Sequence, residues 1–179
     1  MQVMEKAKEK EFLGREFLLW LWVSSEAREG FFDLGESGEV ELIVDGKIKL
    51  QSGEEDDMAT ITCSGRTERL REARFALSEG KAVTQAQLRL TVGEDRWSFV
   101  LDGKWLNLHS LKGPKVFRDK DDHPDSIFYE KLGFIERPVA VVDRLFAEFA
   151  RLRVSPEWEA ETVPAISQWV MEGKGRGSS

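Results

Sequence analysis

The densest group of carboxylates in the chain lies in the segment Asp119-Lys120-Asp121-Asp122-His123-Pro124-Asp125. Carboxylates beside a histidine can hold a divalent cation that assists phosphodiester hydrolysis. The spacing matches no Ca²⁺-binding loop, however, and a run of charged residues is usually a solvated loop. A metal-dependent nuclease that uses Asp119, Asp121, Asp122 and His123 is therefore the third of three hypotheses.

The remaining residue types that could do chemistry are few. His109 falls in a predicted strand, and the single cysteine, Cys63, is far from both histidines in the sequence, so neither favours a metal site. One cysteine also excludes an internal disulfide and is typical of a reducing compartment. The chain contains no Walker loop, dinucleotide glycine fingerprint or nucleophile elbow. We expect no cofactor and no small-molecule substrate, and a binding protein in preference to an enzyme.

Basic residues gather in a predicted helix near residue 70 and in a polar loop near residue 115. Clustered cations can contact phosphates in a salt-sensitive mode that ignores base sequence. In the helix, the alternative is ordinary pairing with Glu68 and Glu72. The candidate phosphate-binding residues are Arg66, Arg69, Arg71, Arg74, Lys81, Arg89, Lys112, Lys115, Arg118 and Lys120.

The formal net charge of −7 over 179 residues argues against a uniformly basic, nucleic-acid-binding coat. It permits a local basic patch on an acidic body. The N-terminal residues are rich in Lys and Glu and have no apolar signal core, so we expect a cytoplasmic protein with no membrane partner.

Alternating apolar residues predict the strands that must position these side chains. Val40–Val44 and Lys47–Leu50 flank Asp45-Gly46, a strong hairpin signal. The other predicted strands cover 58–63, 83–92, 96–101 and 105–111. Short turns join antiparallel neighbours. The pattern predicts an α+β fold, with an antiparallel sheet of about five to six strands built of hairpins and helices on one side.

Helical spacing predicts segments at 11–28, 66–79 (closed by Gly80), 126–132 (ended by Gly133) and from Pro138 to Arg153, with a last helix from Pro156. We expect a charged segment over 1–10, a single domain over 11–172 and a disordered Gly/Ser tail over 173–179.

The segment from Phe17 to Val23 is apolar at seven consecutive positions, two of them tryptophans. Such a helix is apolar all round and must be buried on every side. Either the C-terminal helices cover its second face, with Trp158 and Trp169, or a partner or second copy does. The first arrangement is favoured because those tryptophans are available.

The order of these motifs resembles the C-terminal half of the recombination-associated protein RdgC family over about residues 11–153. The segments that carry the resemblance are Phe17–Glu26, Gly30–Leu34, Leu77–Thr84, Leu88–Leu90, Trp97–Leu101, Trp105–Leu108 and Val139–Leu152.

The resemblance implies a nucleoid-associated protein that binds double-stranded DNA without sequence preference, forms a dimer and modulates DNA recombination. The first hypothesis is therefore an RdgC-like DNA-binding protein. The second is a protein-interaction or accessory module with the same fold and no DNA site, which the net charge of −7 favours.

Overall fold

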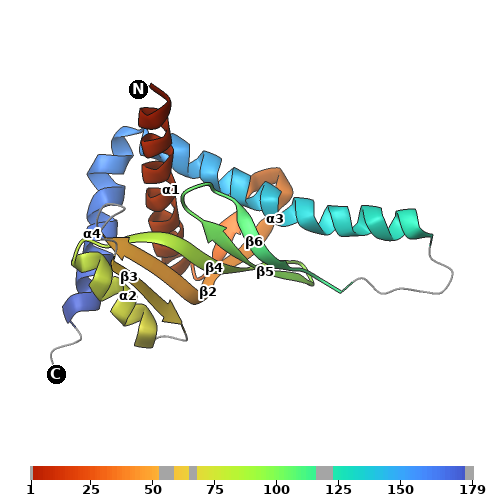
Figure 1. Ribbon diagram of the computed structural model, residues 1–179, viewed down its shortest axis with the longest axis horizontal. Coiled ribbons are helices and arrows are strands. Elements are labelled where there is room, and N and C mark those ends of the chain that lie inside the picture. The colour runs from red at the N-terminus through yellow and green to blue at the C-terminus, as the bar shows by residue number, and fades with distance from the viewer. Residues whose placement is uncertain (1, 53–58, 65–67, 116–122, 176–179) are drawn as a thin grey trace.

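The computed structural model describes residues 2–52, 59–64, 68–115 and 123–175, with side chains placed for 13–52, 61–63, 71–115 and 123–173. Within these ranges the chain forms four α-helices and six strands (Figure 1). The helices are α1 (Gln2–Ala27), α2 (Glu68–Ser78), α3 (Pro124–Arg153) and α4 (Val163–Gly175). The strands are β1 (Phe31–Asp33), β2 (Glu39–Ser52), β3 (Ala59–Ser64), β4 (Ala82–Val92), β5 (Asp95–Asp102) and β6 (Leu108–Lys112).

All strand pairs in this sheet are antiparallel, in the order β1-β2-β4-β5-β6, and β3 pairs with the second half of β2. Buried residues alternate along β2, β4 and β5, so one face of the sheet is covered and the other is open. The covered face packs against α1. The predicted α+β class with an antiparallel sheet is confirmed.

The predicted hairpin at Asp45-Gly46 is wrong, because β2 runs without a break from Glu39 to Ser52. Both of its halves pair with the same long strand, β4. Val44 lies opposite Leu88 and Ile48 opposite Ala86, so the intervening residues of β2 form a bulge. Gly46 sits in this bulge with φ of 107°, a conformation that glycine adopts at little cost.

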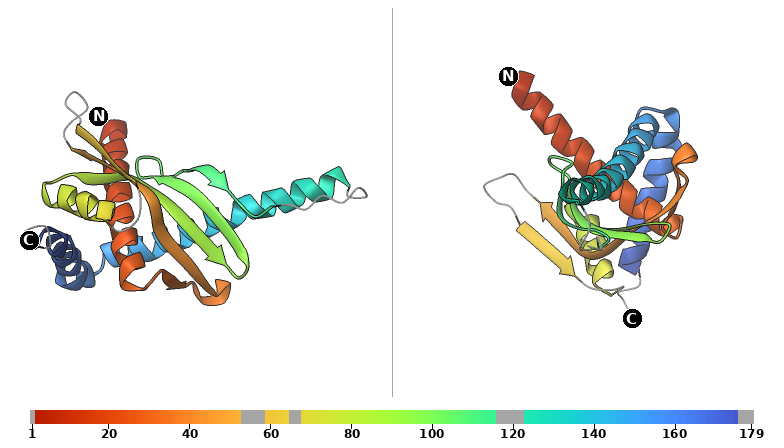
Figure 2. Two further views of the ribbon diagram at one scale, coloured as in Figure 1. Left: turned by 90° about the horizontal axis from the view of Figure 1, so that it is seen from below. Right: turned by 90° about the vertical axis from the view of Figure 1, so that its right-hand side faces the viewer.

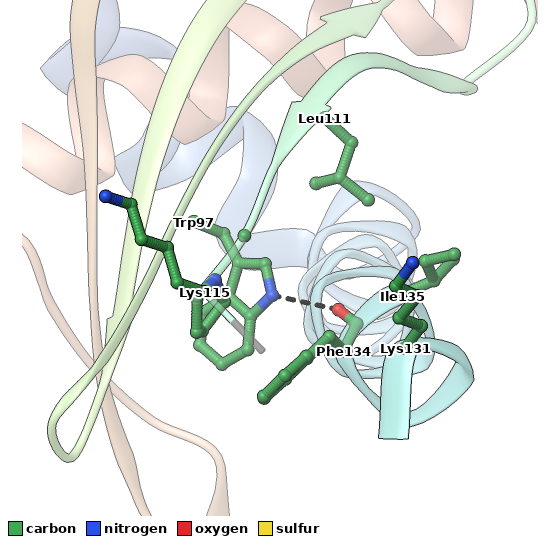
Figure 3. A pocket seen from close by; sticks show the side chains of 8 residues that line it. Trp97, Leu111, Lys115, Lys131, Phe134 and Ile135 are labelled. Carbon is green, nitrogen blue, oxygen red and sulfur yellow. Dashed lines mark hydrogen bonds between the residues drawn. The ribbon is translucent and has the colours of Figure 1, made fainter. Parts of the chain in front are cut away.

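The predicted break between Gly133 and Pro138 is also wrong, because α3 is one helix of 30 residues. Proline has no N–H, so Pro138 leaves the carbonyl of Phe134 without its helical donor. The indole Nε1 of Trp97, on β5, donates to that carbonyl at 2.8 Å (Figure 3). A tertiary hydrogen bond therefore replaces the missing helical one.

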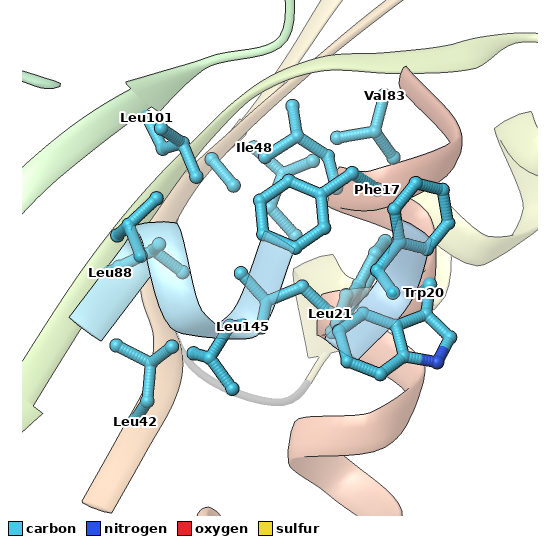
Figure 4. Packing of buried hydrophobic residues seen from close by; sticks show 14 of the residues in the cluster. Phe17, Trp20, Leu21, Leu42, Ile48, Val83, Leu88, Leu101 and Leu145 are labelled. Carbon is cyan, nitrogen blue, oxygen red and sulfur yellow. The ribbon is translucent and has the colours of Figure 1, made fainter. Parts of the chain in front are cut away.

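Five of the seven apolar residues from Phe17 to Val23 are buried, whereas Leu19 and Val23 are only partly buried, so the prediction of burial on every side is wrong for one face of α1. Phe17, Leu18, Leu21 and Trp22 are each at most 1% exposed. Figure 4 shows Phe17 and Leu21 packed among Leu88 and Leu101 of the sheet and Leu145 of α3.

The second face of α1 is covered by the C-terminal helices. The Phe17 ring lies 5.4 Å from Phe149 of α3, and the Trp22 ring lies 4.8 Å from Trp169 of α4. The indoles of Trp22 and Trp169 both donate to the carboxylate of Glu26, at 2.9 and 2.8 Å. The expectation that Trp169 helps to cover this segment is confirmed.

Other element boundaries differ from the prediction by a few residues. The strand predicted from Trp105 begins at Leu108, because residues 103–105 form a turn and Leu106 has φ of 54°. The helix α1 already begins at Gln2, and α4 continues to Gly175. Residues 176–179 lie outside the described part of the chain.

We predict that Gly14→Ala strongly destabilises the protein. A Cβ at Gly14 would clash with the carbonyl oxygen of Gly103 in the turn after β5, so α1 would have to move off the sheet. Gly133→Ala is the matched control: a Cβ there meets nothing within 4 Å, and alanine favours a helix by about 1 kcal/mol over glycine. Thermal unfolding of both variants checks this, and a similar Tm for the two would contradict the close approach.

We predict that Trp97→Phe costs about 2 kcal/mol of unfolding free energy, because the Phe134 carbonyl then loses its donor. In a Pro138→Ala background the same change should cost less, since alanine at position 138 supplies a helical N–H to that carbonyl. Denaturant unfolding of the double-mutant cycle measures the coupling. Equal costs in both backgrounds would show that the indole hydrogen bond does not compensate for the proline.

Candidate functional site

The predicted phosphate-binding residues whose side chains the structure describes do not form one cluster. Arg66, Arg118 and Lys120 lie outside the described residues, and so does the side chain of Arg69. The six that can be placed form two groups. One lies in and just after α2 (Arg71, Arg74 and Lys81), and the other lies on the sheet and just after β6 (Arg89, Lys112 and Lys115).

The α2 group is largely engaged within the fold. The guanidinium of Arg74 lies 4.2 Å from the ring of Trp169 and donates to the Trp169 backbone carbonyl. Lys81 Nζ donates to Ser52 Oγ at 3.1 Å. Arg71 is exposed on the helix surface. Arg74 thus links α2 to α4, and Arg71 is the member of this group with an exposed side chain.

The open face of the sheet brings other cations together. Arg89 of β4 lies opposite Ser98 of β5, and Ser98 lies opposite Lys112 of β6, so Arg89 and Lys112 share one cross-strand row. Directly paired residues in an antiparallel sheet point to the same face. Gln85, Gln87 and Arg89 are every second residue of β4, so their side chains point to the same face. Lys49 of β2 lies opposite Gln85 and therefore points to that face as well.

Lys47 and Lys49 were missed by the sequence reasoning, because the predicted hairpin placed them on a separate strand. Their spacing of two along β2 was the available signal, since it puts both side chains on one face. We call Lys47, Lys49, Arg89 and Lys112 the open-face basic patch.

Three of these four cations have no ion-pair partner among the described residues. Arg89 Nη1 lies 2.9 Å from Asp45 Oδ2, whereas no described carboxylate pairs with Lys47, Lys49 or Lys112. Two glutamines lie between them: Gln87 donates to Ser98 Oγ at 3.4 Å, and Gln85 donates to the Asp102 carboxylate at 2.8 Å. The patch is therefore a set of exposed or half-exposed cations, with the carboxylates of Asp45 and Asp102 beside it.

The opposite end of the same face is acidic. Glu41 lies opposite Phe31 of β1, and Glu39 lies opposite Asp33. Asp33 Oδ1 accepts from the backbone N–H of Gly35 at 2.8 Å, so it closes the turn after β1. Carboxylates therefore predominate at the β1 end, where Arg96 also lies opposite Thr91, and cations predominate from the bulge to β6, where Asp45 and Asp102 also lie.

Aromatic side chains do not provide a stacking surface on the patch. Trp97 and Phe99 point to the covered face and are 2% and 1% exposed. Trp105 is 72% exposed, in the turn after β5, where its backbone N–H and that of Lys104 donate to Asp102 Oδ1. Base stacking across the sheet, as on single-strand-binding sheets, is therefore not supported.

Lys115 lies outside the patch, at a groove of about 500 Å³ between the end of β6 and α3. Residues 116–122, which follow Lys115, are outside the described ranges. The described residues that line the groove are Trp97, Leu111, Gly113, Pro114, Lys115, Lys131, Phe134 and Ile135 (Figure 3).

The residues of the nuclease hypothesis are only partly placed. Asp119, Asp121 and Asp122 lie outside the described residues. His123 caps the N-terminus of α3, where its Nδ1 accepts from the backbone N–H of Asp125 at 3.3 Å. Among the described residues, no group of three or more His, Cys, Asp or Glu side chains could hold a metal ion.

No helix in the described ranges is long and apolar enough to cross a membrane. No protein-family model matches the chain, and no curated protein matches its sequence. Any proposal about function therefore depends on the geometry of the open face.

Proposed function

We propose that this protein binds double-stranded DNA without sequence preference, through phosphate contacts from the open-face basic patch, and that it modulates DNA recombination. The observation that carries the proposal is the gathering of Lys47, Lys49, Arg89 and Lys112 on one uncovered face of a chain whose net charge is −7. The motif order that resembles the RdgC family supports the role in recombination. The protein would act in the cytoplasm, on the nucleoid when bound to DNA.

The dimensions of the patch suit a duplex. Lys49 on β2 and Lys112 on β6 are separated by three strand steps, about 14 Å across the sheet, and by the four residues from Gln85 to Arg89, about 13 Å along β4, so they lie roughly 19 Å apart. This span is wider than the major groove, about 12 Å, so cations at the two ends can reach phosphates on both sides of it. Gln87, between them, is a donor that can bond to phosphate or sugar oxygens, whereas Gln85 already donates to Asp102.

The acidic β1 end limits how DNA can lie. Glu39 and Glu41 would repel phosphates, so the duplex axis must leave the sheet on the side away from β1. Because the patch has only four cations to contact phosphates, we expect a modest affinity for DNA that falls strongly as the salt concentration rises.

The alternative, a protein-interaction module without a DNA site, is favoured by the net charge and by this acidic end. It predicts no binding of duplex DNA at low salt. A titration of duplex DNA with the full chain at low salt therefore distinguishes the two hypotheses.

We predict that Lys47→Gln/Lys49→Gln weakens binding to every duplex sequence by a similar factor and lowers the slope of log K against log salt by roughly 2, because each lost phosphate contact removes about 0.9. Fluorescence anisotropy with two unrelated duplexes over a range of NaCl concentrations measures this. The control, Arg137→Gln/Arg151→Gln, makes the same charge change at exposed positions on α3 and should leave the slope unchanged. Equal salt slopes for the two double variants would exclude the open-face basic patch as the DNA-binding site.

We also predict that Lys115→Glu with Arg118→Glu weakens duplex binding in addition to the patch variant, and equally for all sequences. Lys115 is exposed at the groove beside the end of β6, three residues after Lys112, and Arg118 follows it in the sequence. Anisotropy on the combined variant tests additivity. Unchanged affinity would confine the DNA contacts to the sheet.

A further inference from the structure

The first half of α3 extends beyond the sheet into solvent (Figures 1 and 2). Four apolar side chains on this half are exposed: Phe128 by 62%, Leu132 by 39%, Ile135 by 50% and Val139 by 38%. Tyr129, beside them, is 69% exposed. These values are high for large apolar residues that lie on one helix and close together.

These residues belong to a longer seam. The apolar residues of α3 recur at alternating spacings of four and three residues. The series is Phe128, Leu132, Ile135, Val139, Val142, Phe146 and Phe149. That is the heptad spacing by which one helix packs along another. We call Phe128 to Val139 the open half of the seam.

The second half of this seam is already occupied by a helix. Val142 is 3% exposed and Phe149 is fully buried. The Phe17 ring of α1 lies 5.2 Å from Phe146 and 5.4 Å from Phe149. The seam is thus filled by α1 at Phe146 and Phe149 and is exposed up to Val139, which indicates that the open half is suited to a further helix.

We propose that the open half packs against the same segment of a second copy, as an antiparallel helix pair about a two-fold axis. A self-complementary surface forms such an isologous contact. In this register Phe128 faces the partner's Val139, and Leu132 faces the partner's Ile135. Large and smaller side chains therefore alternate across the contact.

The antiparallel direction follows from the position of α1. In a parallel pair the partner's helix would continue along the seam past Val139 and meet α1 where Phe17 packs on Phe146 and Phe149. In an antiparallel pair the partner's helix leaves past Phe128, the free end of α3, and its own domain lies at the opposite end.

The exposed area is sufficient for a dimer. From about 200 Å² for a fully exposed aromatic side chain, and somewhat less for Leu, Ile and Val, the five exposed residues present about 450–500 Å² per copy. A standard interface buries about 800 Å² per partner, of which about 56–65% is apolar. The apolar area of the open half is therefore the amount that a specific dimer requires.

One polar contact fits the same arrangement. Tyr129 and Glu136 lie on the same edge of the seam, seven residues apart. Antiparallel pairing brings like edges together, so the Tyr129 hydroxyl can donate to the carboxylate of the partner's Glu136. The contact occurs twice by symmetry.

Sedimentation velocity of the full chain without DNA, over protein concentrations from about 1 to 100 µM, tests the proposal. The wild type should sediment as two copies at the upper concentrations. Leu132→Asp/Ile135→Asp should sediment as one copy throughout, with the wild-type Tm at low concentrations, where the wild type is also a single copy, because both positions are exposed. The control Val154→Asp, at a position 86% exposed outside the seam, should keep the wild-type behaviour. A wild type that remains a single copy at all concentrations overturns the proposal.

Cross-linking tests the direction of the pair. In a Cys63→Ala background, a mixture of Leu132→Cys and Ile135→Cys chains should form a disulfide between the two variants, because these positions face each other across the antiparallel seam. Predominant linkage of each variant to itself would indicate a parallel pair and overturn the proposed arrangement. Neither experiment uses DNA, so the outcome does not depend on the proposed function.

Discussion

The burial of α1 between the sheet and the C-terminal helices is the constraint on which the rest of the structure depends. The apolar segment from Phe17 to Val23 needs two surfaces, because its side chains cover the whole circumference of the helix. The inner face of the sheet supplies one surface, and α3 and α4 supply the other through Phe149 and Trp169. The helices that cover α1 are therefore on the same side of the sheet as α1. The other sheet face is left open, and its alternating polar residues are what makes it available to a ligand.

The parts of the fold that follow from local pattern could be predicted from the sequence. Alternation placed β3, β4 and β5 within a residue or two, and helical spacing with Gly80 placed α2. The two errors, at Asp45-Gly46 and at Gly133 to Pro138, have one cause. Turn-forming residues end an element only if nothing elsewhere in the fold compensates for them. In β2 the compensation is pairing of both halves with β4, and in α3 it is the indole of Trp97.

The candidate site was predictable only in part, for the same reason. Arg89 and Lys112 could be named from the sequence, but their common row depends on the β4–β5–β6 register. Lys47 and Lys49 could not be added while β2 was divided in two. Arg74 was named as a phosphate contact from its charge alone, whereas its contact with Trp169 is a tertiary feature. The open half of the seam was hidden because the predicted break at Gly133 interrupts the heptad spacing.

The hydrogen bond from Trp97 to the Phe134 carbonyl also has a consequence for the stability of α3. Most helices can close all their interior hydrogen bonds from local sequence, and so form early. In α3 the turn before Pro138 is completed only by a donor on β5, which exists in position only after the sheet has formed. The Phe134 carbonyl therefore gains its partner only when α3 is docked on β5, so the turn before Pro138 depends on a tertiary contact for its stability.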